Sequence, residues 1–162
     1  MAFSKRYTVL NFYIRGSSQI PQSNHGISNL WKKFFSKELC EQADELFNNW
    51  AFKAETEVVL QGGDDEAMEQ LFTELDAIKH LPSAKFNEPG LRGACTVVTF
   101  VADERIISGI NFARNNRLTP YNVEAELAGK EIDHVNPDES KFVLTDEEVF
   151  VVSKVAFMPL AS

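Results

Sequence analysis

Two polar segments of this sequence carry side chains that could bind an anionic molecule. The first, residues 15–24, follows an apolar stretch and precedes a helical pattern. The start of a helix presents free backbone N–H groups, and serine, amide and guanidinium groups donate hydrogen bonds to phosphate oxygens. The candidate ligand-binding side chains here are Arg15, Ser17, Ser18, Gln22 and, in the first helical turn, His25. An ordinary polar loop with Ser23 or Asn24 as the helix cap fits the same residues, so spacing alone leaves both interpretations open.

The second polar segment, residues 83–93, is predicted to be a loop because proline and glycines interrupt it. Its candidate ligand-binding side chains are Asn87, Glu88 and Arg92. Glu88 could accept a hydrogen bond from a ligand amine or hydroxyl while Arg92 binds an anion, or the two could form a surface ion pair of little energetic value. If the protein is an enzyme, Glu88 and His25 are the candidates for proton transfer, although a lone histidine is more often structural.

Other chemistry finds little support in the sequence. It contains no nucleophile elbow, no Walker-type phosphate loop and no dinucleotide glycine fingerprint. Two cysteines and three scattered histidines do not show the spacing of metal ligands, so we expect neither a metal nor a cofactor. Cys40 and Cys95 both have apolar neighbours, and we expect small core residues rather than a disulfide.

The elements that would position these segments alternate between strand and helix. The predicted strands cover residues 7–14, 56–60 and 94–101, and the predicted helices begin near residues 25, 39, 64 and 103. Asp64 or Asp65 can cap one helix and Asp103 another. This order predicts an α/β fold with a mixed, mostly parallel sheet flanked by helices. Ligands of such sheets bind beyond the carboxyl ends of the strands, where residues 15–24 and 83–93 are expected to lie.

The last third of the chain differs in character. Residues 130–146 are charged, and the apolar run at 149–157 is predicted to be a further strand, paired with residues 142–145. We therefore expect one domain over residues 1–162, with a core at 7–114 and a C-terminal β extension at 115–162. This extension could extend the sheet, cover an edge or form a subunit contact.

The overall charge limits the range of partners. The formal net charge is -8, and the sequence pI is about 4.9. Because phosphate contacts dominate nucleic-acid affinity, an extended DNA or RNA footprint is not expected, whereas a small anion in a pocket depends on local donors. No apolar run approaches the roughly 20 residues that a membrane span needs, and no secretory signal is evident at the start. We expect a cytoplasmic protein that does not bind membranes.

The order of motifs resembles the type II peptidyl-tRNA hydrolase family over about residues 7–113. In that family a Gln-x-x-His motif follows the first strand, a tryptophan precedes a valine-rich strand, and a Leu-Pro pair precedes an aspartate-containing loop and a strand opening with Thr-Val. The matching positions are Gln22 and His25, Trp50 with Glu57-Val58-Val59-Leu60, Leu81-Pro82, Asn87-Glu88-Pro89-Gly90-Leu91-Arg92, and Thr96-Val97. The resemblance implies the hydrolase II-like fold and a homodimer.

Departures from the family bear on activity. Ser18 stands where the family has its catalytic lysine, Glu88 replaces the family's aspartate, and Arg92 replaces a neighbouring threonine. Ester hydrolysis needs its polarising and water-positioning groups held accurately, so losing two of them predicts weakened or absent hydrolysis.

The sequence thus predicts a binding protein rather than an enzyme. We expect a pocket that holds a small nucleotide-type ligand and could sequester it, as viral anti-defence proteins do with immune signalling nucleotides in the host cytoplasm. Two alternatives stay open: an active or weakened peptidyl-tRNA hydrolase, and a protein–protein interaction module whose pocket is vestigial.

Overall fold

A four-stranded sheet with the strand order β2-β1-β4-β3 forms the centre of the computed structural model, which describes residues 3–161. The strands are β1 (Lys5–Leu10), β2 (Glu57–Gln61), β3 (Ser83–Glu88) and β4 (Ala94–Ala102). β1 and β2 are parallel, whereas β4 pairs antiparallel with both β1 and β3. The α/β class and the mixed sheet are confirmed, but the prediction of a mostly parallel sheet was wrong.

The strand that sequence analysis missed explains this difference. Residues 83–88 form β3, a sheet edge, although the segment was predicted to be a loop. A short turn, η3 (Pro89–Leu91), joins β3 to β4, and so tight a connection reverses the chain into a hairpin. The three strands expected in the core, at residues 7–14, 56–60 and 94–101, lie within a few residues of their predicted positions.

Helices cover both faces of the sheet. They are α1 (Gln19–Phe35), α2 (Glu41–Asn49), α3 (Asp65–Ala77), α4 (Glu104–Asn115), α5 (Val123–Leu127) and α6 (Asp146–Val155). A 3-10 turn, η1 (Gly16–Ser18), precedes α1, and a π turn, η2 (Trp50–Ala54), continues α2. The side chains of Asp64 and Asp103 accept backbone N–H groups of α3 and α4, as their predicted capping roles require.

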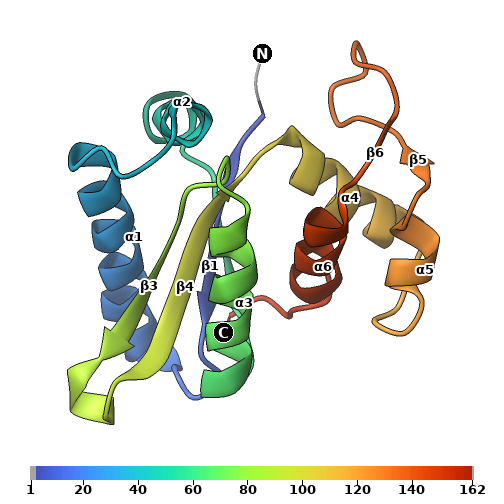
Figure 1. Cartoon of the computed structure of the whole chain (residues 1–162). Helices are drawn as coiled ribbons and strands as arrows, with labels where there is room; N and C mark the ends of the chain where they lie inside the picture. Colours follow the sequence, from blue (N-terminus) through green and yellow to red (C-terminus); the bar gives the residue numbers. More distant parts are fainter. Residues whose placement is uncertain (1–2, 162) are drawn as a thin grey trace.

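Alternation along the strands divides the core into two parts. Ala84 and Val101 pack with Leu30 of α1 and Phe47 of α2 on one face. On the other face, side chains of α3, α4 and α6 pack against Val98, among others. A Cβ on Gly26 of α1 would lie 3.1 Å from the Val97 side chain, so the glycine lets the helix approach β4 closely. Figure 1 shows α1 beside β3 and α3 in front of β4.

The C-terminal third is helical where a strand was expected. Most of the apolar run at 149–157 lies in α6, so the predicted β extension and its pairing with residues 142–145 were wrong. Thr145 and Glu148 form a capping box, with each side chain accepting the backbone N–H of the other residue, which fixes the start of the helix. Two short strands, β5 (Glu131–Ile132) and β6 (Phe142–Val143), pair with each other apart from the main sheet.

Both edges of the main sheet are covered. Asn29 and Lys33 of α1 donate hydrogen bonds to the carbonyl groups of Lys85 and Ser83 on β3, each at 2.8 Å. At the other edge, residues 159–161 run along β2, where Leu160 forms a bridge with Leu60. Sheet edges protected in this way are poor templates for pairing with another chain.

The two cysteines are free but differ in environment. Cys95 is buried in β4, as expected, whereas Cys40 is exposed at the start of α2, contrary to the prediction that both are core residues. The Cys40 thiol donates to the Lys79 carbonyl at 3.1 Å. Across residues 3–161, every helix is too short or too polar to cross a bilayer.

Candidate functional site

The two polar segments identified in the sequence meet at the end of the sheet where β1 stops and the β3–β4 hairpin turns, the lower end in Figure 1. Gln22 of α1 donates its amide N–H to a Glu88 carboxylate oxygen at 3.2 Å. Its carbonyl oxygen accepts the Thr96 hydroxyl at 2.5 Å. We call Gln22, His25, Phe86, Glu88 and Thr96 the rim cluster.

An irregular register places these side chains together. Phe86 pairs with Val97 and Asn87 with Cys95, so the β4 residue between them, Thr96, has no partner on β3. Such a bulge redirects side chains locally. The Thr96 side chain is fully buried, and the Gln22 amide supplies the acceptor that its hydroxyl needs.

Glu88 is held as a carboxylate. Hydrogen bonds from Gln22 and from the Gly90 backbone lower the pKa of Glu88, and nearby His25 acts in the same direction. A carboxylate with a lowered pKa is a weak base at neutral pH. The arrangement therefore favours accepting hydrogen bonds over removing protons.

His25 offers a flat surface at the same place. Its ring stacks on Phe86 with centroids 4.2 Å apart and an interplanar angle of 13°, while the residue stays exposed to solvent. A stacked, exposed imidazole can contact a flat ligand ring as readily as an anion.

Four other predicted residues lie close to the rim cluster in the chain. The Ser18 hydroxyl donates to the Arg15 carbonyl at 2.6 Å, which closes the turn before α1. Arg15 and Ser17 are exposed, so their side chains are accessible to a ligand. Arg92 follows η3 directly, also exposed, with a left-handed φ of 58°.

Asn87, predicted in the same segment as Glu88, faces away from the rim cluster. Its amide donates to Glu69 of α3 at 2.7 Å and to the Gly93 carbonyl at 2.8 Å. Lys85 reaches the other Glu69 oxygen at 2.6 Å. Because side chains alternate along β3, Lys85 and Asn87 face α3 while Phe86 and Glu88 face α1. Hydrogen bonding from Lys85 first, and also from Asn87, lowers the pKa of Glu69.

Next to Asn87 lies a further group of polar side chains that sequence analysis did not identify. Asn11, fully buried at the end of β1, donates to Asp65 at 2.6 Å and to the Cys95 carbonyl at 3.0 Å. The Tyr13 hydroxyl donates to the same Asp65 oxygen at 3.1 Å. Burial raises the pKa of the Cys95 thiol to about 12, so Cys95 stays protonated and unreactive.

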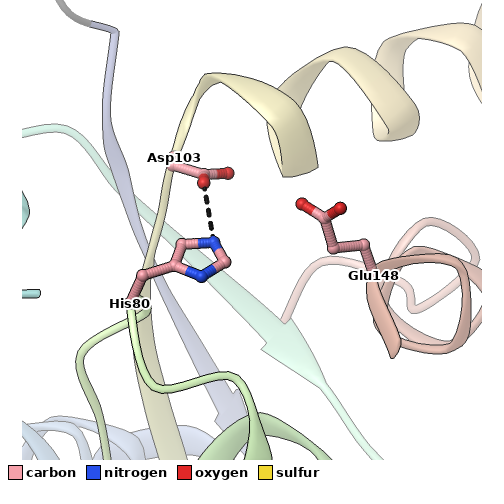
Figure 2. Close-up of side chains that lie close together, drawn as sticks. All are labelled: His80, Asp103 and Glu148. Atoms are coloured by element: carbon pink, nitrogen blue, oxygen red, sulfur yellow. Dashed lines mark hydrogen bonds and ion pairs between the residues drawn. The ribbon is translucent and has the colours of Figure 1, made fainter. Parts of the chain in front are cut away.

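A third group lies at the opposite end of the sheet, where β4 meets α4. Figure 2 shows His80 hydrogen-bonded to Asp103, with Glu148 of α6 nearby, and the His80–Asp103 distance is 3.1 Å. The Asp103 hydrogen bond is the main cause of a raised His80 pKa. Nothing in the sequence indicated this pair, because the two residues are brought together only by the folding of β3 onto β4.

Ligand atoms of His80, Asp103 and Glu148 lie within 4.8 Å of one another, which makes this group, among residues 3–161, the one with metal-like spacing. Arg105 nevertheless donates to both Glu148 oxygens, at 2.8 and 2.9 Å. Glu148 is 1% exposed and also accepts the Thr145 backbone N–H. A guanidinium on both oxygens competes with a cation, so the group is better suited to joining α4 with α6.

Comparison with known proteins identified no relative of this chain. No protein-family model matches the sequence, and a search of curated proteins found no significant match.

Proposed function

We propose that this protein binds a small nucleotide-type anionic ligand at the rim cluster and holds it without breaking a bond. The observation that carries the proposal is the Gln22–Glu88 hydrogen bond, which joins two polar segments far apart in the chain. Exposed Arg15 and Arg92 flank that bond in the chain and supply positive charge for phosphate. Sequestering a signalling nucleotide, as an anti-defence protein would, is the role that fits such binding.

The local chemistry favours binding over turnover. Ser18, which stands where the resembling hydrolase family has a lysine, uses its hydroxyl to close the turn before α1. Glu88 is paired with an amide and a backbone N–H rather than with a group that could relay a proton. A binding site without an activated nucleophile stabilises a complex rather than a transition state.

A weakened peptidyl-tRNA hydrolase activity is the second candidate. It is favoured by one observation, that Gln22, His25 and Glu88, which stand at positions of that family's motifs, lie in one cluster. Release of an N-blocked amino acid from tRNA, abolished by Glu88→Gln, would support this candidate.

The binding proposal is tested by titrating mono-, cyclic and dinucleotides into the protein by calorimetry. We expect at least one to bind and to be recovered chemically intact. Arg92→Asn removes the cation but keeps a residue that tolerates the left-handed backbone, and we expect roughly tenfold weaker binding, since hydrogen bonds to charged groups contribute about 1.5–3 kcal/mol.

A matched control exists in Arg117, which is also exposed and has a similar φ of 51°. Arg117 follows α4, a helix that contributes no residue to the rim cluster. Arg117→Asn should therefore leave the affinity for the nucleotide unchanged. Equal affinities for the Arg92 and Arg117 variants would contradict the proposed site, and so would the absence of binding by every nucleotide.

A further inference from the structure

A cavity of about 420 Å³ lies on the other flank of α1, between the helix and the strands β1 and β2. This volume lies within the range of about 300–1,000 Å³ that is typical of small-molecule sites. The polar side chains lining it include Arg6 and Glu57 from the strands and Ser23 and Asn24 from α1. Ile20 and Val59 contribute apolar surface.

Arg6 is unusual among the arginines of this chain. Its side chain is only 7% exposed, and one terminal nitrogen, Nη2, forms an ion pair with Glu57. The two other guanidinium nitrogens, Nε and Nη1, are buried and have no hydrogen-bond partner among residues 3–161. The guanidinium carbon lies 5.3 Å from the centre of the Trp50 ring, which fixes the group from one side. Buried donors without acceptors are rare in native proteins, and they point to a missing partner.

The charges in the cavity limit what that partner can be. Arg6 and Glu57 form a neutral pair, and the Glu57 carboxylate would repel an anion placed next to it. A neutral ligand fits better if it carries an acceptor for Arg6 and, beside it, a donor for Glu57. Ser23 already donates to Glu57 at 3.4 Å, a weak bond that such a donor could replace.

We propose that this cavity binds a nucleobase through an edge in which a carbonyl group adjoins a ring N–H, as in hypoxanthine, guanine or uracil. The carbonyl oxygen accepts from Arg6, the N–H donates to Glu57, and the ring lies against Ile20 and Val59. The proposal rests on the nucleotide-binding function and deepens it by naming the base. Gln22 and Ser23 are neighbours in α1 but contact different strands, Glu88 of β3 and Glu57 of β2, so the rim cluster and the cavity lie on two sides of the first turns of α1.

The sharpest test compares two ligands that differ only at this edge. Inosine 5′-monophosphate has the carbonyl and the N–H, and purine riboside 5′-monophosphate lacks both. Calorimetric titration of the intact protein should show the inosine nucleotide binding at least about tenfold more tightly, because a site with buried polar groups rejects an analogue that leaves them unpaired.

Variants of α1 test whether the preference for the inosine nucleotide arises in this cavity. Ser23→Leu fills part of the cavity, and we expect it to abolish the preference for the inosine nucleotide. Ser28→Leu, the same change at an exposed position of the same helix that does not line the cavity, should keep the preference. Arg6→Lys tests the guanidinium directly. If the Arg6→Lys variant does not fold, the comparison of Ser23→Leu with Ser28→Leu still tests whether the base binds in the cavity.

The possible outcomes separate the two proposals. Equal affinities for the two monophosphates, or a preference that Ser23→Leu leaves intact, would overturn the base site and leave the rim cluster standing. Binding of inosine nucleoside itself, unaffected by Arg92→Asn, would support the base site even if no phosphate contact exists. A change of the Trp50 indole NMR signal, with the Trp31 signal unchanged, would further support binding beside Arg6, and a Trp50 signal that stays fixed at saturation would count against it.

Discussion

The pairing of His80 with Asp103 makes the stability of the fold depend on pH. The Asp103 hydrogen bond raises the pKa of His80 above its ordinary value of 6.5. Below about pH 6.5 the histidine is protonated in the folded and unfolded chains alike, and the pair contributes its full stabilisation. As the pH rises further, the unfolded chain releases this proton first, so the free energy of unfolding falls until the folded protein has released it too.

Urea denaturation between pH 5.5 and 8.5 measures this decline. We expect His80→Gln to reduce the decline above pH 6.5, because the variant cannot bind the proton. His25→Gln is the control and should keep the decline, since His80 is unchanged. The assignment to His80 would be wrong if its variant lost stability with pH as steeply as the natural sequence does.

Sequence analysis predicted which side chains lie near the site better than it predicted which way each of them points. Gln22 and Glu88 were expected to converge, and their hydrogen bond confirms it. Asn87 was placed in the same group, but it faces α3. Which way a strand side chain points depends on register, and here the bulge at Thr96 sets that register. Arg6 was missed because only the fold shows that two of its three guanidinium nitrogens are buried without acceptors.

Among the elements, α6 depends on its capping box. Thr145→Ala removes the side-chain acceptor of the Glu148 N–H, and we expect it to lower the free energy of unfolding by about 1 kcal/mol. Thr73→Ala is a matched control within α3, because that hydroxyl donates only to the Glu69 carbonyl of its own helix and is exposed. Chemical denaturation of both variants at one pH measures the difference. If both variants lowered the free energy of unfolding by the same small amount, the capping box would not stabilise α6.

The residues of α6 show why this helix was predicted to be a strand. The run at 149–157 is rich in valine, which favours strands, although Val149, Val152 and Ala156 also have the three- and four-residue spacing of a helix. The helix exists because Thr145 and Glu148 fix its start and because a Cβ-free position, Gly109 of α4, lets Val152 pack closely. β3 was missed for the opposite reason. Its residues alternate between the two faces, but the neighbouring prolines and glycines indicated a loop.

At the scale of the whole molecule, the net charge of -8 acts against an anionic ligand. The long-range field slows the approach of a nucleotide, whereas the arginines at the rim attract it only at short range. We expect the association rate constant of a bound nucleotide to rise between about 20 mM and 200 mM salt, because salt screens distant charges most.

Stopped-flow measurements at several salt concentrations test this expectation. An uncharged ligand such as inosine nucleoside is the control, and its association rate should not depend on salt. If the association of the nucleotide slowed as salt increased, the ligand would be approaching through a positive rather than a negative field.

The covered edges of the sheet also restrict how copies of this chain can assemble. Residues 159–161 occupy one flank of β2, and α1 side chains take up the outward carbonyl groups of β3. Continuation of the sheet from one subunit into the next is therefore blocked on both sides. If the chain forms the homodimer that the resemblance to the hydrolase family implies, the subunits must join through surfaces other than the edges of the main sheet. Such an assembly would leave the hydrogen-exchange protection of all four strands the same in monomer and dimer.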